Sequence, residues 1–298
     1  MRKTKAFTLI ELLVVVAIIA LLISILLPSL ARARELSKRT VCSANVRGVG
    51  QACKIYAQEN MEFWPTVETV STKVTYTTTI GTNRSSVSDA SSSSMSTTRN
   101  FWMLIRNGDI TVKLMKCPSS NEQMDDTENL NTYYDFKGTG YVSYGYQIPY
   151  PTPNLCRPSE DMDPRMVLVA DRGPWGTLGQ AGANGPDGPA QSLYVGNGQT
   201  QPGQKISQFS RDDLRGLNSP NHGGAGNGEG QNCLFQDGHV EFMQTSFTGI
   251  DNDNIFTTLD ISGKTEMTLG RSPFDNKLPG EDSLGNLRNS STDSFIYP

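Results

Sequence analysis

The sequence predicts an α+β protein in which one long N-terminal helix is followed by a β-rich domain. Residues 9–27 are apolar apart from Glu11 and Ser24, a run long enough for a helix to cross a hydrocarbon core of about 30 Å. A helical pattern with one apolar face then continues to about Asn60. Beyond it, short β-branched and aromatic runs alternate with Gly-, Ser- and Thr-rich stretches, which favours strands joined by long irregular loops.

The first residues have the order of a processed membrane signal. A basic leader ends at Ala6, an aromatic residue follows at Phe7, and an acid, Glu11, lies inside the apolar run. A carboxylate in such a run is energetically unfavourable and therefore indicates a function. A Sec signal peptide would be cleaved after the apolar run, and neither it nor a simple anchor accounts for this order. The segment resembles the class III signal of type IV pilins and type II secretion pseudopilins.

The resemblance implies a role for four residues. Prepilin peptidase would cleave between Ala6 and Phe7 and N-methylate Phe7; the family usually has Gly where this chain has Ala6. Glu11 would be the fifth residue of the mature chain, where the family keeps an acid for assembly. Pro28 would be the helix-kinking proline of many pilins, because proline removes a backbone hydrogen bond.

These observations divide the chain into three parts. Residues 1–6 are the leader, residues 7–60 are the pilin helix with its transmembrane part at about 7–27, and residues 61–298 are an extracytoplasmic β-rich domain. The resemblance implies that the second half of the helix packs on an antiparallel sheet. Its expected apolar face is Val41, Ala44, Val49, Ala52, Ile55 and Tyr56, with Gly48 and Gly50 weakening the helix locally. The basic leader predicts a cytoplasmic N-terminus and a domain on the other side of the membrane.

The remaining elements follow from local patterns. The sequence predicts a short helix at 101–105 and a hairpin at 232–243 whose turn contains Asp237 and Gly238. Further predictions are a strand or hairpin within 66–83, a flexible loop at 84–99, a strand end and turn at 114–118, strands at 141–146 and 166–171, and an irregular excursion at 173–204.

Charge and cysteine content limit the environment. The net charge of −4 becomes about −7 when residues 1–6 are removed, and basic residues do not cluster, which argues against a nucleic-acid surface. Five cysteines, Cys42, Cys53, Cys117, Cys156 and Cys233, would lie in an oxidising compartment. Their odd number leaves at least one unpaired, and buried thiols and one or two disulfides are both compatible with the sequence.

The histidines, His222 and His239, lie near Asp237 in the sequence. Together with Asp237, and with Asp171 as a further ligand, they could hold zinc. The alternative is structural: Asp237 and Gly238 make a turn, His239 points outward and His222 bonds to a loop. The spacing resembles the His…Asp-Gly signature of a prepilin-like family, with a longer interval here. Calcium is a second candidate at Asp251, Asp253 and Asp260, where an acidic solvated loop is the alternative.

The expected function is assembly and not catalysis, since the sequence lacks G-x-S-x-G, HExxH and phosphate-loop motifs. The resemblance implies a structural subunit of a bacterial envelope filament, closest to a type II secretion pseudopilin, anchored once in the inner membrane. Its partners would be prepilin peptidase, other pilin or pseudopilin subunits and the inner-membrane assembly platform. The alternative is a membrane-anchored extracytoplasmic domain that binds a metal or a glycan.

Overall fold

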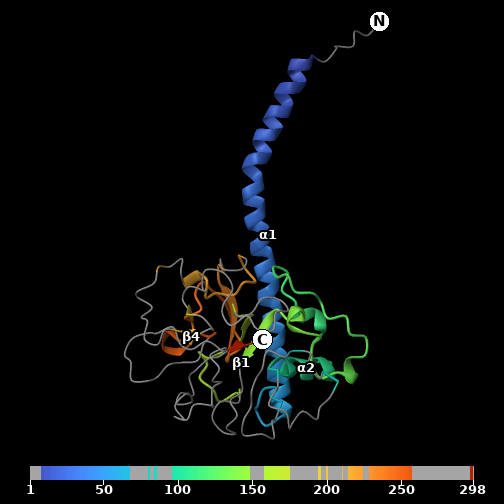
Figure 1. Cartoon of the computed structure of the whole chain (residues 1–298), viewed down its shortest axis with the longest axis vertical. Coiled ribbons are helices and arrows are strands. Elements are labelled where there is room, and N and C mark those ends of the chain that lie inside the picture. Colours follow the sequence, from blue (N-terminus) through green and yellow to red (C-terminus); the bar gives the residue numbers. More distant parts are fainter. Residues whose placement is uncertain are drawn as a thin grey trace.

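The structure of the chain is a computed structural model that describes part of the sequence. The described residues are 8–67, 80, 84–85, 96–147, 158–174, 194–195, 199–200, 210, 214–223, 228–256 and 296–297. One long helix, α1, projects from a domain that is packed around its C-terminal half (Figure 1).

Helix α1 spans Leu9–Glu59, about 75 Å at 1.5 Å per residue, and confirms the predicted helix to within two residues. It begins at a capping box: the Glu11 N–H donates to Thr8 Oγ1 at 3.3 Å, and the Thr8 N–H donates to Glu11 Oε2 at 2.8 Å, so two free donors are satisfied. Pro28 lies inside the helix and removes one backbone donor. The exposed part of α1 curves in Figure 1.

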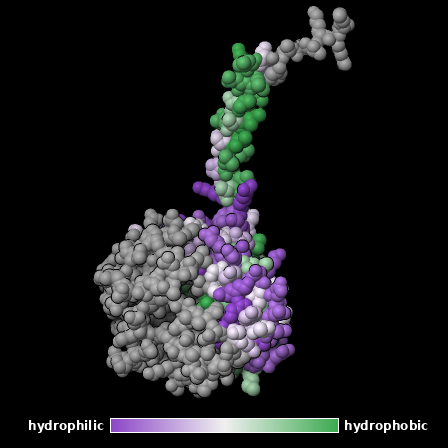
Figure 2. Space-filling model, turned by 45° about the vertical axis from the view of Figure 1, so that its right-hand side comes forward, coloured by the Kyte–Doolittle hydropathy of each residue, from purple (hydrophilic) through white to green (hydrophobic). Residues whose placement is uncertain are grey.

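The two halves of α1 have different surroundings. All residues from 8 to 34 are exposed, and Figure 2 shows them as a largely apolar rod that becomes hydrophilic near the domain. Among the described residues, α1 is the one helix long and apolar enough to cross a membrane. The C-terminal half instead buries a stripe of small and medium side chains: Cys42, Val46, Val49, Gly50, Ala52, Cys53 and Ala57.

This stripe corrects the predicted apolar face. Val49 and Ala52 are buried as expected, but Val41, Ala44 and Ile55 are exposed. The buried face is rotated towards small residues because they let the helix approach the sheet closely. At Gly50 a Cβ atom would lie 2.6 Å from Leu234 Cδ2, so this glycine is a packing position rather than a weak point of the helix.

The sheet under α1 has five strands in the order β6-β5-β2-β1-β7, and every neighbouring pair is antiparallel, which confirms the predicted α+β arrangement. The three inner strands, β5, β2 and β1, are buried along their whole length. The strands are β1 (Tyr144–Gln147), β2 (Val167–Asp171), β5 (Gln231–Phe235), β6 (Val240–Met243) and β7 (Ile296–Tyr297).

The predicted strand at 166–171 and the hairpin at 232–243 are confirmed as β2 and as the β5–β6 pair. The hairpin turn places Gly238 at φ 94°, a backbone conformation that side chains with a Cβ disfavour. Helix α2 (Thr98–Asn107) confirms the helix expected at 101–105 and packs near β1, where the Phe101 and Tyr146 rings meet edge to face at 5.2 Å.

Several local predictions are wrong or incomplete. Helix α2 starts inside the predicted loop at 84–99 because Thr98 Oγ1 donates to the buried Asp135 carboxylate at 2.6 Å. Residues 112–115 form a 3-10 helix, η2 (Val112–Met115), in place of the strand end predicted near 114. The strand predicted at 141–146 is shorter than expected, because the 3-10 helix η4 (Thr139–Tyr141) takes up its first residue. Inside the predicted excursion, two short strands pair with each other, β3 (Tyr194–Val195) and β4 (Gln199–Thr200). The remaining 3-10 helices are η3 (Leu130–Thr132) and η7 (Ile250–Asn252). Most of the hairpin predicted at 66–83 lies outside the described residues.

Candidate functional site

The first candidate site is the exposed part of α1, residues 8–34, which we call the stalk. Its apolar side chains are uncovered along its length, from Leu9 at 77% exposure to Leu27 at 59%, far more than a soluble monomer normally exposes. Ser24 and Ser29 donate to the carbonyls of Leu21 and Leu26 at 2.7 and 2.8 Å. The stalk can therefore enter an apolar environment without leaving these two hydroxyl groups unpaired.

Glu11 is the acid at the tip of the stalk. Its carboxylate accepts hydrogen bonds from the backbone N–H and the hydroxyl of Thr8, at 2.8 and 2.9 Å, and so lies against the positive end of the helix dipole. The predicted processing residues, Ala6 and Phe7, lie outside the described residues, and cleavage between them stays a prediction. The described geometry places the acid of the predicted motif at the first turn of an exposed apolar helix.

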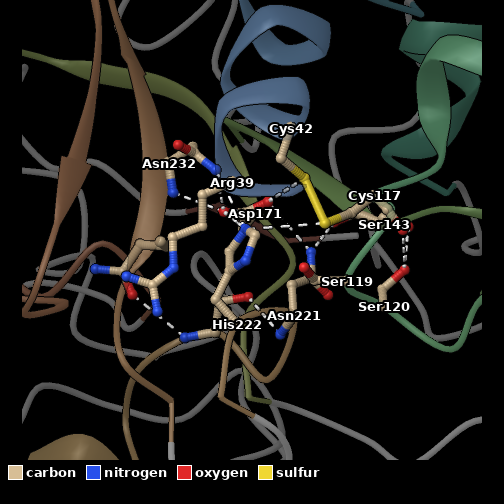
Figure 3. A network of polar contacts seen from close by, with 12 residues as sticks. Arg39, Cys42, Cys117, Ser119, Ser120, Ser143, Asp171, Asn221, His222 and Asn232 are labelled. Atoms are coloured by element: carbon tan, nitrogen blue, oxygen red, sulfur yellow. Dashed lines mark hydrogen bonds and ion pairs between the residues drawn. A yellow bond between two sulfur atoms is a disulfide. The ribbon is translucent and has the colours of Figure 1, made fainter. Parts of the chain in front are cut away.

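The second candidate site is a group of buried polar side chains at the base of the stalk, which we call the buried cluster: Cys42, Cys117, Asp171 and His222 (Figure 3). Four separate segments supply it. Cys42 comes from α1, Cys117 follows η2, Asp171 ends β2, and His222 lies in the segment 214–223 beside the sheet. The cluster thus forms where the long helix enters the domain.

A disulfide joins Cys42 to Cys117 across a sequence separation of 75, with Cα atoms 5.3 Å apart. The sequence left the pairing open, and the structure resolves it for these two residues. A loop of this length stabilises the fold by roughly 4 kcal/mol in the chain-entropy model. Cys53 and Cys233 are buried free thiols, and burial raises the pKa of both, so they are poor nucleophiles. Cys156 lies outside the described residues.

Asp171 is fully buried and accepts three hydrogen bonds from two asparagines. The Asn232 N–H and side-chain Nδ2 donate to its Oδ2 at 2.6 and 3.0 Å, and Asn221 Nδ2 donates to its Oδ1 at 3.2 Å. These three hydrogen bonds take the place of the hydrogen bonds to water that the carboxylate loses when it is buried.

His222 is also fully buried and lies between two carboxylates. Its Nδ1 is 2.9 Å from Glu35 Oε1 on α1, and its Nε2 is 3.3 Å from Asp171 Oδ2. Burial acts to lower the pKa of His222, but the hydrogen bonds and charges of Asp171 and Glu35 outweigh it and raise the pKa. Partial burial acts to raise the pKa of Glu35, but hydrogen bonds from His222 and Ser119 lower it.

The structure does not bring His222, Asp237 and His239 together. His239 lies on the half-exposed turn, where its Nδ1 is 2.5 Å from Asp237 Oδ1 and its ring stacks on Phe235. Phe235 is the last residue of β5, whereas His222 contacts Asn232 near the start of that strand. These two positions are three residues, or roughly 10 Å, apart. The three residues predicted as a possible metal site therefore do not form one group in this structure: Asp237 and His239 lie in a turn, and His222 belongs to the buried cluster with Asp171.

Two members of the buried cluster were not among the predicted site residues. The sequence leaves open whether Cys42 and Cys117 are thiols or form disulfides, and nothing in their spacing places them beside His222. The calcium loop expected at Asp251, Asp253 and Asp260 stays a prediction. Asp253 is buried, but the side chain of Asp251 and all of Asp260 lie outside what the structure describes.

A long helix, apolar and exposed in one half and packed on an antiparallel sheet in the other, defines an α+β pilin-like protein. Residues 1–27 match the model of the prokaryotic N-terminal methylation motif. Over 63 residues the chain is 41% identical to the type IV wide pilus major component PilA4 of Thermus thermophilus, an alignment that covers 21% of this chain and 48% of that protein. The chain thus spans about half the length of this curated relative. No solved structure matches the chain at a significant level.

Proposed function

We propose that this chain is a structural subunit of a bacterial envelope filament of the type II secretion pseudopilin kind, and that its activity is assembly. The observation that supports the proposal most strongly is the stalk, a helix that is exposed from residue 8 to residue 34 and continues without a break into the folded domain. Between Leu9 and Leu27 it is apolar apart from Glu11 and Ser24. Such a surface needs an apolar partner, which is lipid before assembly and neighbouring stalks after it.

Before assembly, the stalk anchors the precursor in the inner membrane with the leader in the cytoplasm and the domain outside. Prepilin peptidase cleaves between Ala6 and Phe7 and methylates the new N-terminus, as the methylation motif at residues 1–27 suggests. The other partners in this proposal are the inner-membrane assembly platform and further pilin or pseudopilin subunits.

During assembly, the Phe7 α-amine of one subunit pairs with the Glu11 carboxylate of its neighbour. Neither charge is stable alone between apolar helices, and pairing reduces the cost of burying both. Because Glu11 already lies at the helix tip, the pair would set the axial register between subunits while the stalks pack side by side.

The test is the location of the native protein. We expect an antibody against the domain to label filaments sheared from cells that express the chain, with the stalk inside and the domain outside. A chain that stays dispersed in the inner membrane of cells whose other pilins assemble would contradict the proposal. A membrane-anchored domain without filament assembly would then be the better description.

A further inference from the structure

We infer that Cys42, Cys117, Asp171 and His222 form a four-ligand site for Zn²⁺ when the disulfide between the two cysteines is reduced. One ligand atom from each residue lies within 4.8 Å of all the others, and all four residues are buried. Two thiolates, an imidazole and a carboxylate are ligands that zinc binds in proteins. The site goes beyond filament assembly and does not depend on it.

Several separations inside the cluster are close to those between the ligands of a tetrahedral zinc ion. Zinc–ligand lengths of about 2.0–2.3 Å put ligand atoms about 3.3–3.8 Å apart in a tetrahedron. Three contacts in the cluster fall in this range: His222 Nε2 is 3.3 Å from Asp171 Oδ2 and 3.8 Å from Cys117 Sγ, and Cys42 Sγ is 3.6 Å from the other oxygen of Asp171, Oδ1. The main change needed is the opening of the sulfur–sulfur bond.

The groups around the cluster orient His222 as a metal ligand. His222 Nδ1 lies 2.9 Å from Glu35 Oε1, and Nε2, on the other side of the ring, lies 3.3 Å from both Asn232 Nδ2 and Asp171 Oδ2. This arrangement, in which a carboxylate holds one imidazole nitrogen and the other nitrogen faces the remaining ligands, is typical of zinc sites. Figure 3 shows the His222 ring facing Asp171 and the two sulfur atoms.

The other ligands have supporting contacts as well. Asp171 keeps three hydrogen bonds from Asn221 and Asn232, and the Tyr144 hydroxyl lies 3.2 Å from Cys42 Sγ. Such contacts hold ligand side chains in place when a metal is bound. The domain therefore already contains both the ligands and the groups that position them.

Loading the site requires a two-electron reduction. An added dithiol gives two electrons and two protons to the Cys42–Cys117 bond, leaves two thiols and becomes a cyclic disulfide itself. Zn²⁺ then displaces both thiol protons to water and binds the thiolates. Because Cys42 is on α1 and the other ligands are in the domain, the ion would tie the helix to the domain as the disulfide does.

The experiment uses the full chain in detergent micelles. After reduction with a dithiol, incubation with Zn²⁺ and gel filtration, we expect about one zinc per chain by mass spectrometry of the metal, and less than a tenth of that in the oxidised chain. The variants His222→Ala and Cys117→Ser should lose the metal at least tenfold. The variants His239→Gln and Cys53→Ala are matched controls, since they change a histidine and a cysteine outside the cluster, and should keep it.

A second readout does not depend on any variant. Co²⁺ added to the reduced wild-type chain should give thiolate-to-cobalt charge-transfer absorption, and Zn²⁺ should remove it. A reduced chain that stays folded by circular dichroism but binds neither ion would overturn the inference. Equal zinc in wild type and in folded His222→Ala, or loss of zinc in His239→Gln, would overturn it too.

Discussion

A Glu11→Val chain should enter the membrane and be cleaved normally, yet be incorporated into filaments about tenfold less than wild type. In the proposed assembly, valine would suit the apolar surroundings but would leave the Phe7 amine of a neighbour without its carboxylate. A tenfold loss corresponds to about 1.4 kcal/mol, a modest part of the cost of an unpaired charge in an apolar interior. The measurement is the ratio of variant to wild type in sheared filaments from cells that express both.

Ser24→Ala is the matched control for this experiment. Ser24 is the other polar side chain between Leu9 and Leu27, and its hydroxyl bonds to a carbonyl of its own helix, so its loss should leave incorporation within about twofold of wild type. Normal incorporation of Glu11→Val would show that the acid only caps the helix through Thr8, as it does in the isolated subunit.

The Asp171→Ala variant should lose about 3 kcal/mol or more of unfolding free energy. The substitution leaves buried donors of Asn221 and Asn232 without an acceptor, and each such group typically costs about 1–3 kcal/mol. A denaturant titration of the oxidised full chain in detergent, with a chelator present, measures this without any metal contribution.

Asp163→Ala serves as the comparison, because Asp163 forms an ion pair with the exposed Arg165 at 2.8 Å. Surface pairs of this kind contribute about 1 kcal/mol or less. If the two variants were equally stable, Asp171 would not organise the base of the stalk, and the buried cluster would be a consequence of packing.

Local patterns were sufficient for α1, β2 and the β5–β6 hairpin. An apolar run and a 3.6-residue period identify a helix from neighbouring residues alone, and Asp237-Gly238 fixes a turn through the positive φ of Gly238. The strand predicted near residue 114 failed because η2 is a short 3-10 segment whose position depends on contacts with α1. The edge strand β7 is only two residues long, which is too short for an alternation of apolar and polar residues to be recognised.

The buried face of α1 could not be predicted for a related reason. Apolar residues occur on several sides of its second half, and the sheet selects the side where Gly50 allows Leu234 to approach. Hydrophobicity alone favoured Val41 and Ile55, which remain exposed. Close packing depends on the shape of both partners, and the sequence pattern describes only one of them.

The candidate site residues also differ in whether local sequence is enough to identify them. The expected roles of Glu11 and Pro28 could be predicted because they follow from the neighbouring residues in the sequence. His222 and its partner Asp171 could be named, but two other partners could not: Glu35 is 187 residues away from His222 and Cys117 is 105 away. The short-range set with Asp237 and His239 is not brought together in the structure because β5 runs between the two histidines.

The mature N-terminus tests the central claim most directly. Intact-mass analysis and N-terminal sequencing of the protein from native membranes should give a chain that begins at Phe7 with a methylated α-amine. A chain that begins at Met1, or one cut after the apolar run near Ala33, would contradict the assignment of this protein as a processed pilin-like subunit.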